Sequence, residues 1–131
     1  MNFNPVFLTL SEVVEIHKNQ IECYGGREGI RDIFLLTSAI GILESTFEGQ
    51  YLHSDIFEMA VAYAYHICMN HPFVDGNKRT GLTAALVFLD FNGIEIEDPE
   101  DILYKTVMKV ASGKKRKDYL ADVLKKLSTK G

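Results

Sequence analysis

The sequence is poor in cysteine, carries no excess of positive charge and lacks an extended apolar run, and each absence excludes a class of protein. Its only two cysteines are Cys23 and Cys68, and Cys68 falls in an apolar segment. Such a pair indicates reduced core residues in a cytoplasmic protein rather than a disulfide framework. The formal net charge of −4 at pH 7 argues against binding to nucleic acid, which favours basic surfaces.

The longest uncharged segment is too polar to cross a membrane. It runs from Met59 to Val74 and includes two histidines, an asparagine and a proline, so it makes a poor membrane span. The first residues, Met-Asn-Phe-Asn-Pro, lack the basic start and apolar stretch of a signal peptide. The chain has 131 residues, 47% hydrophobic and 24% charged, with no linker or repeat. One cytoplasmic domain over residues 1–131, without membrane contact, is therefore expected.

Cap and periodicity signals predict six helices and no sheet of any size. The first helix follows a capping box at Thr9–Glu12 and ends at the Gly25-Gly26 pair. Ser54 is expected to cap the third helix and Pro99 to start the fifth. An all-α bundle is therefore predicted. The other helices are expected near residues 34–46, 55–70, 78–91, 99–111 and 118–128, with a connector at 48–53 and a very short strand at 94–97.

The ten residues that begin at His71, between the third and fourth helices, carry most of the chemistry. They read His-Pro-Phe-Val-Asp-Gly-Asn-Lys-Arg-Thr, which places an imidazole, a carboxylate, an amide and two cations between apolar segments. Pro72 disfavours helical backbone at His71 and ends the incoming helix near Asn70. The Asp-Gly pair is a strong turn signal. Either Asn77 or Asp75 is then expected to cap the next helix through a side-chain oxygen.

Two cations follow at a place where a helix disfavours them. Lys78 and Arg79 lie in the first turn of the expected fourth helix, where the macrodipole is already positive and each cation costs roughly 0.3–1 kcal/mol. The pattern makes physical sense if an anion rests on the free N–H groups of this helix end, with Gly76 allowing close approach. With Asp75 as a Mg²⁺ ligand and His71 as a proton acceptor, the stretch predicts a phosphate cradle.

Each of these residues also has a purely structural interpretation. Asp75 alone would more often be a helix cap, and His71 a loop histidine bonded to backbone, but neither interpretation explains the neighbouring cations. His66 and His71 lack the i, i+4 spacing of a zinc helix, and no P-loop spacing is present. The run Lys114–Lys117 is interpreted as a solvated connector, with a docking patch for acidic surfaces as the alternative. DNA recognition is disfavoured because the helix after Thr80 lacks a polar outer face.

The pattern His-Pro-Phe-x-Asp-Gly-Asn-x-Arg resembles the core motif of the Fic/Doc family, which are nucleotide-dependent transferases acting on protein hydroxyls. The resemblance extends to the length, the opening helix, Tyr24-Gly-Gly26 and the central helical hairpin, and so covers essentially the whole chain. Lys78 before Arg79, and Leu82 where a second arginine is usual, resemble the Doc (death-on-curing) branch, whereas Gly76 is closer to the general Fic pattern. The resemblance implies a six-helix bundle with a central hairpin and at most a very short β flap.

The resemblance also implies a role for each motif residue. His71 would be the general base that takes a proton from a Ser, Thr or Tyr hydroxyl of a target protein. Asp75 would hold the Mg²⁺ of the nucleotide, and Lys78 and Arg79 would neutralise charge that develops on its phosphates. The implied catalytic residues are thus His71, Asp75 and Arg79, and the implied nucleotide-binding residues are Gly76, Asn77, Lys78 and Arg79.

In the family, a flap beside the active site docks the target segment as an added strand. The corresponding region here is the connector at 48–53, so the resemblance implies that Tyr51 and His53 line the target groove. Composition alone favours a plain loop at this place.

Leu82 bears on the reaction that the resemblance implies. Typical Fic proteins transfer AMP and hold the γ-phosphate side of ATP with the second arginine. Without that arginine, delivery of the γ-phosphate is expected, as in Doc-type kinases. The implied function is a toxin of a toxin–antitoxin pair that phosphorylates a hydroxyl of a target protein, with the translation machinery as the implied target. The alternatives are AMP transfer and a non-catalytic Fic-like binding domain.

A toxin of this kind needs an inhibitor. Some family members carry a Ser/Thr-x-x-x-Glu-Gly/Asn helix in the same chain, but Ser45-Thr-Phe-Glu-Gly49 has the wrong spacing. A small, partly disordered antitoxin that folds on binding is therefore the expected partner.

Overall fold

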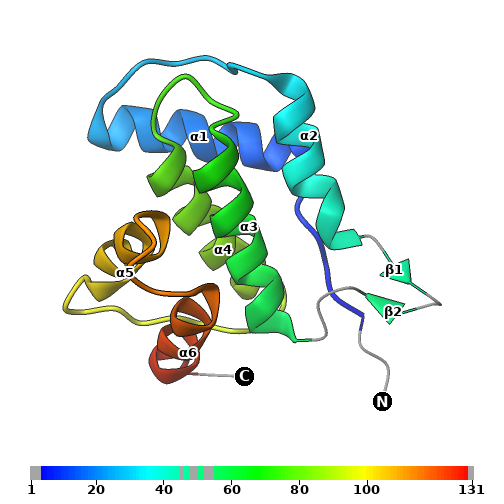
Figure 1. Cartoon of the computed structure of the whole chain (residues 1–131), viewed down its shortest axis with the longest axis vertical. Helices are drawn as coiled ribbons and strands as arrows, with labels where there is room; N and C mark the ends of the chain where they lie inside the picture. The colour runs from blue at the N-terminus through cyan, green and yellow to red at the C-terminus, as the bar shows by residue number, and fades with distance from the viewer. Residues whose placement is uncertain (1–3, 45, 48–49, 52–54, 130–131) are drawn as a thin grey trace.

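The chain folds into a bundle of helices arranged around a central hairpin, α3 and α4 (Figure 1). The structure is a computed structural model that describes residues 4–44, 46–47, 50–51 and 55–129, the two middle segments by their backbone alone. The predicted all-α fold, with six helices and at most a very short β flap, is confirmed for these residues. The elements are α1 (Leu10–Tyr24), α2 (Ile33–Gly41), the 3-10 turn η1 (Ile42–Glu44), β1 (Thr46–Phe47), β2 (Gln50–Tyr51), α3 (Ile56–Asn70), α4 (Asn77–Phe91), α5 (Ile102–Ala111) and α6 (Lys117–Leu127).

The two helices of the hairpin approach closely because a glycine of α4 faces the backbone of α3. A Cβ atom at Gly81 would lie only 2.7 Å from the carbonyl oxygen of Ala64, a separation that side chains cannot adopt. Further along the hairpin, the rings of Tyr63 and Phe88 meet with 5.1 Å between centroids. The largest fully buried side chains are Tyr63, Phe73, Phe88, Leu36, Leu43, Met59, Ile67, Leu89, Leu103, Leu120, Leu124 and Val13.

Helix α1 begins at the predicted capping box. The Thr9 side chain accepts a hydrogen bond from the N–H of Glu12, and the Glu12 carboxylate accepts one from the N–H of Thr9. After α1 ends, the loop toward α2 passes over the turn between α3 and α4 (Figure 1). No helix in the described part of the chain is both long and apolar enough to span a bilayer.

Two predicted helix starts are wrong, because aspartates provide the caps. Asp55 caps α3 by accepting hydrogen bonds from the N–H groups of the second and third helical residues; the predicted cap, Ser54, lies outside the described residues. Helix α5 begins at Ile102 and not at Pro99, because the carboxylate of Asp98 accepts hydrogen bonds from the N–H groups of Ile102 and Leu103.

The predicted second helix and the predicted short strand also differ from the structure. The helix expected over 34–46 ends at Gly41, since the chain tightens into η1 and Thr46 then pairs with Tyr51 in the antiparallel ladder of β1 and β2. Residues 94–97 form no strand; they contribute one isolated bridge, between Ile96 and Ser128.

Candidate functional site

The motif forms the turn between α3 and α4 together with the first turn of α4. Helix α3 ends at Asn70, as Pro72 predicts, and His71 follows in the left-handed conformation with φ 50°. This conformation costs an L-residue about 1–2 kcal/mol. Neighbouring structure must therefore hold it in place.

The loop that follows α1 holds this turn by its backbone carbonyls. The Arg31 guanidinium donates from Nε to the carbonyl oxygen of His71 at 2.6 Å and from Nη2 to that of Asn70 at 2.8 Å. The backbone N–H groups of Arg31 and Asp32 both donate to the carbonyl oxygen of Pro72, at 2.7 and 3.0 Å. The last carbonyls of α3 thereby gain partners, and the cation suits the negative end of the helix dipole. Sequence analysis missed Arg31, because a single loop arginine carries no pattern.

The two groups proposed for acid–base and metal chemistry are both open to solvent. His71 is exposed, and its ring makes no hydrogen bond to a described residue. Asp75 is also exposed; its Oδ1 accepts from the N–H of Gly76 at 3.0 Å and its Oδ2 from the N–H of Arg27 at 3.2 Å. Because a carboxylate has about four acceptor positions, these two bonds orient Asp75 and leave capacity for a further ligand.

A buried histidine supports the turn from α1. His17 is 3% exposed, its ring stacks on Phe73 with 3.9 Å between centroids, and its Nε2 lies 2.8 Å from the carbonyl oxygen of Asp75. The tautomer with a proton on Nε2 donates that hydrogen bond. Sequence analysis did not identify His17, although its place on the apolar side of α1, between Val13 and Ile21, was a readable signal.

Neither predicted cap closes the start of α4. The N-cap is Gly76, with φ 74° and no side-chain cap. The Asn77 side chain instead turns back, accepting from the N–H of Phe73 and donating to its carbonyl oxygen, both at 3.0 Å. A Cβ at Gly76 would lie 3.0 Å from Cδ1 of Ile21. The backbone angle and the proximity of α1 both favour glycine here, and the approach of a ligand at Gly76 stays a prediction.

The absence of a side-chain cap leaves a row of donors at the start of α4. The first hydrogen bond of the helix joins the N–H of Thr80 to the carbonyl oxygen of Gly76 at 3.0 Å. The N–H groups of Asn77, Lys78 and Arg79 have no acceptor among the described residues. Free N–H groups and a positive dipole at a helix N-terminus bind anions, so this helix end has the chemistry of a phosphate site.

The two cations of the motif have different neighbours. Burial raises the pKa of the Cys68 thiol of α3, and the positive charge of Lys78 opposes this shift. The Arg79 guanidinium lies 3.9 Å from the ring centroids of both Tyr24 and Tyr104, on the side of α1 and α5. Cys23 and Cys68 are both free thiols, as predicted, but only Cys68 is buried; Cys23 is exposed on α1, so its predicted place in the core is wrong.

Comparison with known proteins tests the resemblance to the Fic/Doc family. The Fic/DOC family model matches residues 7–89. Protein kinase doc of Escherichia phage P1 is 32% identical over 116 residues, which are 88% of this chain and 90% of that protein. Toxin Doc of Mycolicibacterium smegmatis is 34% identical over 79 residues, 60% of this chain and 61% of that protein.

This chain belongs to the Fic/Doc family. The motif that suggested the resemblance falls inside the matched region, and so do α1, the α1–α2 loop and most of the hairpin. All the contacts described above that orient His71 and Asp75 therefore come from the part of the chain that matches the family.

The donor set of this Fic/Doc site fits a magnesium ion that arrives with a nucleotide. Mg²⁺ is usually held by one or two carboxylates, by phosphate oxygens and by water. Asp75 offers one exposed carboxylate beside the free N–H groups of α4. Among the described residues, no group of three or more His, Cys, Asp or Glu side chains could hold a metal ion. The phosphate oxygens of the nucleotide and water would therefore have to supply the other ligands.

The predicted target flap is only partly visible. Tyr51 belongs to β2, which pairs with β1 through Thr46 and through the Phe47–Gln50 register, but its side chain is not described. His53 lies outside the described residues. Their role in holding a target segment stays a prediction.

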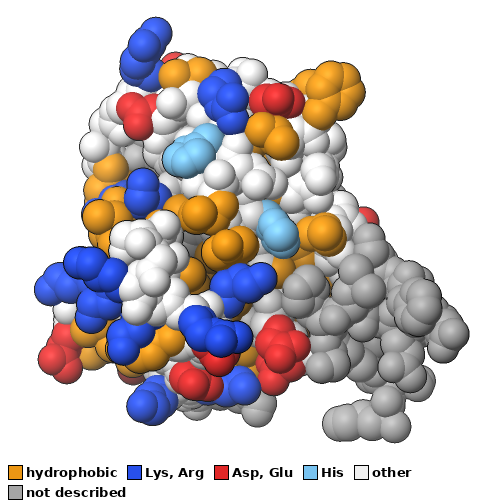
Figure 2. All heavy atoms as spheres, viewed as in Figure 1, with side chains coloured by type: hydrophobic (Ala, Val, Ile, Leu, Met, Phe, Trp, Pro, Cys, Tyr) orange, Lys and Arg blue, Asp and Glu red, His pale blue; other side chains and the backbone are white. Residues whose placement is uncertain are grey.

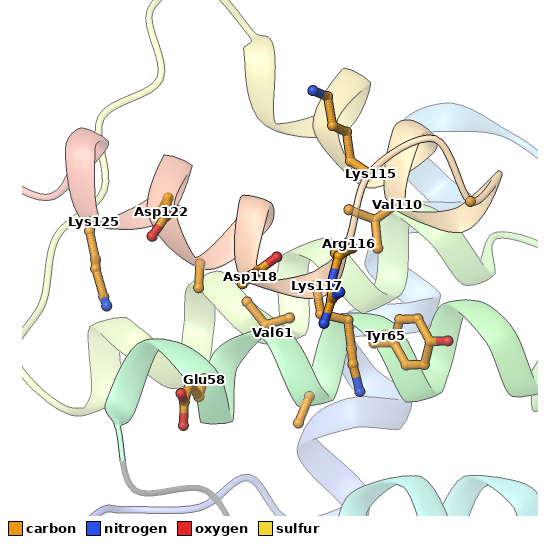
Figure 3. A pocket seen from close by; sticks show the side chains of 13 residues that line it. Glu58, Val61, Tyr65, Val110, Lys115, Arg116, Lys117, Asp118, Asp122 and Lys125 are labelled. Carbon is orange, nitrogen blue, oxygen red and sulfur yellow. The ribbon is translucent and has the colours of Figure 1, made fainter.

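One pocket among the described residues contains no motif residue. It measures about 660 Å³ and lies between α3 and α6 (Figure 3). Lys117 extends over the Tyr65 ring at 4.6 Å, and Glu58, Asp118 and Asp122 balance the basic side chains around it. Lys and Arg side chains gather over α5 and α6 in Figure 2, mixed with acidic ones. The exposed run Lys114–Lys117 agrees with a solvated connector.

Loss of the Arg31 side chain is expected to destabilise the protein by about 1–2 kcal/mol, because two carbonyls at the end of α3 lose a charged partner. Urea unfolding of Arg31→Ala measures this. Arg31→Lys should recover only part of the loss, since an ammonium cannot reproduce the planar two-donor geometry. Arg27→Ala is the matched control: Arg27 donates to Asp75 through its backbone, so its stability should change by less than about 0.5 kcal/mol. Equal losses for the two alanine variants would contradict this role of Arg31.

Proposed function

We propose that this Fic/Doc protein is a toxin that transfers the γ-phosphoryl group of Mg-ATP to a Ser, Thr or Tyr hydroxyl of a target protein. One observation carries the proposal. At the start of α4, three N–H groups without an acceptor among the described residues lie close in sequence to an exposed imidazole and an exposed carboxylate. The names of the two relatives, a protein kinase and a toxin, support the same reading.

In the proposed reaction the protein positions the reactants and balances charge. The target hydroxyl oxygen attacks the γ-phosphorus while His71 accepts the hydroxyl proton, and the bond between the γ-phosphorus and the bridging oxygen breaks to release ADP. The N–H groups of Asn77, Lys78 and Arg79 bind phosphate oxygens. Donors that are already oriented lose little energy on reorganisation, which favours the transition state.

Asp75 is the residue proposed to hold Mg²⁺. When bound, the ion would neutralise part of the negative charge on the phosphate oxygens. The two hydrogen bonds from the N–H groups of Gly76 and Arg27 fix the orientation of this carboxylate before any ligand binds.

The proposal includes an antitoxin as the partner that restrains the protein. Because Ser45-Thr-Phe-Glu-Gly49 does not match the internal inhibitory pattern, inhibition in trans is proposed, by a small protein that folds on binding. The target is proposed to belong to the translation machinery, by analogy with the Doc branch.

Labelled nucleotide distinguishes the proposed reaction from AMP transfer. The protein is incubated with a bacterial lysate and ATP labelled at either the α or the γ position, and protein-bound label is followed on a gel. Phosphoryl transfer predicts label from the γ position only. Protein-bound label from the α position alone would refute the proposal and favour AMP transfer. If calorimetry shows no Mg-ATP binding and neither label is transferred, the chain is a non-catalytic binding domain.

A further inference from the structure

The side chain of Arg79 contacts two tyrosine rings. Its guanidinium carbon lies over both rings, 3.9 Å from the centroid of the Tyr24 ring and 3.9 Å from that of the Tyr104 ring. The cation gains from the electron-rich face of each ring, and the two contacts together restrict where the side chain lies.

The N–H groups of this guanidinium have no acceptor in the part of the chain that the structure describes. A guanidinium has five such donors in a fixed fork geometry. Among the described residues Arg79 makes no hydrogen bond or ion pair; the one ion pair there joins Lys125 and Asp55. Asp98 and Asp101 line the same pocket of about 230 Å³, yet neither pairs with Arg79. The Asp98 carboxylate is occupied by the N–H groups at the start of α5.

The same end of α1 reaches both Arg79 and the proposed metal ligand. Tyr24 is the last residue of α1, and two residues later a Cβ at Gly26 would lie 2.9 Å from Oδ2 of Asp75. The next residue, Arg27, donates its N–H to that oxygen. One short segment thus holds the carboxylate with its backbone and the guanidinium with a ring.

We propose that Tyr24 and Tyr104 are positioning residues that hold the Arg79 guanidinium in place, unpaired with the nearby aspartates and ready to receive the phosphates of the nucleotide. The inference rests on the proposed function and deepens it, since it assigns a role to two residues outside the motif. Neither phenol hydroxyl has a hydrogen-bond partner among the described residues. The rings, and not the hydroxyl groups, therefore position the Arg79 guanidinium.

Mg-ATP binding by calorimetry tests this inference in the full-length protein. Tyr24→Leu and Tyr104→Leu should each raise the dissociation constant about two- to fivefold, and the double variant about tenfold. The phenylalanine variants keep the rings and should bind like the wild type. Tyr119→Leu is a matched control, because Tyr119 contacts a different cation, Lys115, at 4.7 Å. Tyr24 is 61% exposed, so the variants should fold, which thermal unfolding verifies.

A double-mutant cycle separates positioning from a general structural effect. In an Arg79→Ala background the two leucine substitutions should have no further effect on the dissociation constant, because the cation they position is gone. Wild-type affinity in the double leucine variant, or equal losses with and without Arg79, would overturn the inference while leaving the proposed function intact. Absence of Mg-ATP binding in the wild type would overturn both.

Discussion

His71→Ala is expected to lower the transfer of label from ATP to protein by about 10²–10⁴-fold, which is the usual contribution of a general base. The imidazole is exposed and makes no hydrogen bond to a described residue, so it is free to accept the proton of a target hydroxyl. The measurement is protein-bound label over time with the wild type and the variant, at saturating Mg-ATP. Unchanged labelling would show that the base is another group.

The left-handed backbone of His71 provides a control for folding. At φ 50° glycine is unstrained, whereas alanine keeps the cost of a Cβ. His71→Gly should therefore be about 1 kcal/mol more stable than His71→Ala while being equally inactive. Both variants should still bind Mg-ATP, because the N–H groups of α4 remain. If activity followed stability across the two variants, the loss would reflect folding and not chemistry.

Gly81→Ala is expected to destabilise the protein by about 1–3 kcal/mol, even though alanine is the better helix former. The new Cβ would meet the carbonyl oxygen of Ala64 at 2.7 Å, and both groups belong to rigid helical backbone. The hairpin must open to accept it, which weakens packing along α3 and α4. Gly81→Val should be more destabilising still. Urea or thermal unfolding gives the difference.

Gly41→Ala is the matched control for this prediction. Gly41 is the last residue of α2, and a Cβ there has no heavy atom within 4 Å. Alanine should therefore be neutral or stabilising by up to about 1 kcal/mol. A Gly81→Ala protein as stable as Gly41→Ala would mean that α3 and α4 can separate without loss, and the close contact would not be a determinant of the fold.

Much of this fold was predictable because the signals were local. The capping box at Thr9–Glu12 and the proline after His71 fixed the start of α1 and the end of α3 from a few neighbouring residues. The motif also predicted the turn between α3 and α4 that the structure shows. Pro99 was misleading, because a proline favours a helix start. Helix α5 begins three residues after Pro99, at Ile102, where the carboxylate of Asp98 accepts the first N–H groups of the helix.

The supports of the site were not predictable because they depend on distant contacts. Nothing in the spacing of Arg31 shows that its guanidinium caps α3, and nothing around Tyr104 shows that its ring meets Arg79. The side chain of Asn77 illustrates the same point: it has the chemistry of a cap, but Phe73 is close enough in the folded turn to take both its hydrogen bonds. The pattern predicted the candidate reactive groups, and the tertiary structure determines which of them are oriented and which residues orient them.

The hydrogen bonds that orient the turn join residues far apart along the chain: 40 positions separate Arg31 from His71, 48 separate Arg27 from Asp75, and 58 separate His17 from Asp75. An isolated hairpin of α3 and α4 would lack all three, so its motif would have reactive groups without fixed directions. Contacts of such long range form late and together in the folding of a small domain. Under the proposed function, catalytic competence should therefore arise in the same cooperative step as the native state, and a partly synthesised chain should not act as a toxin.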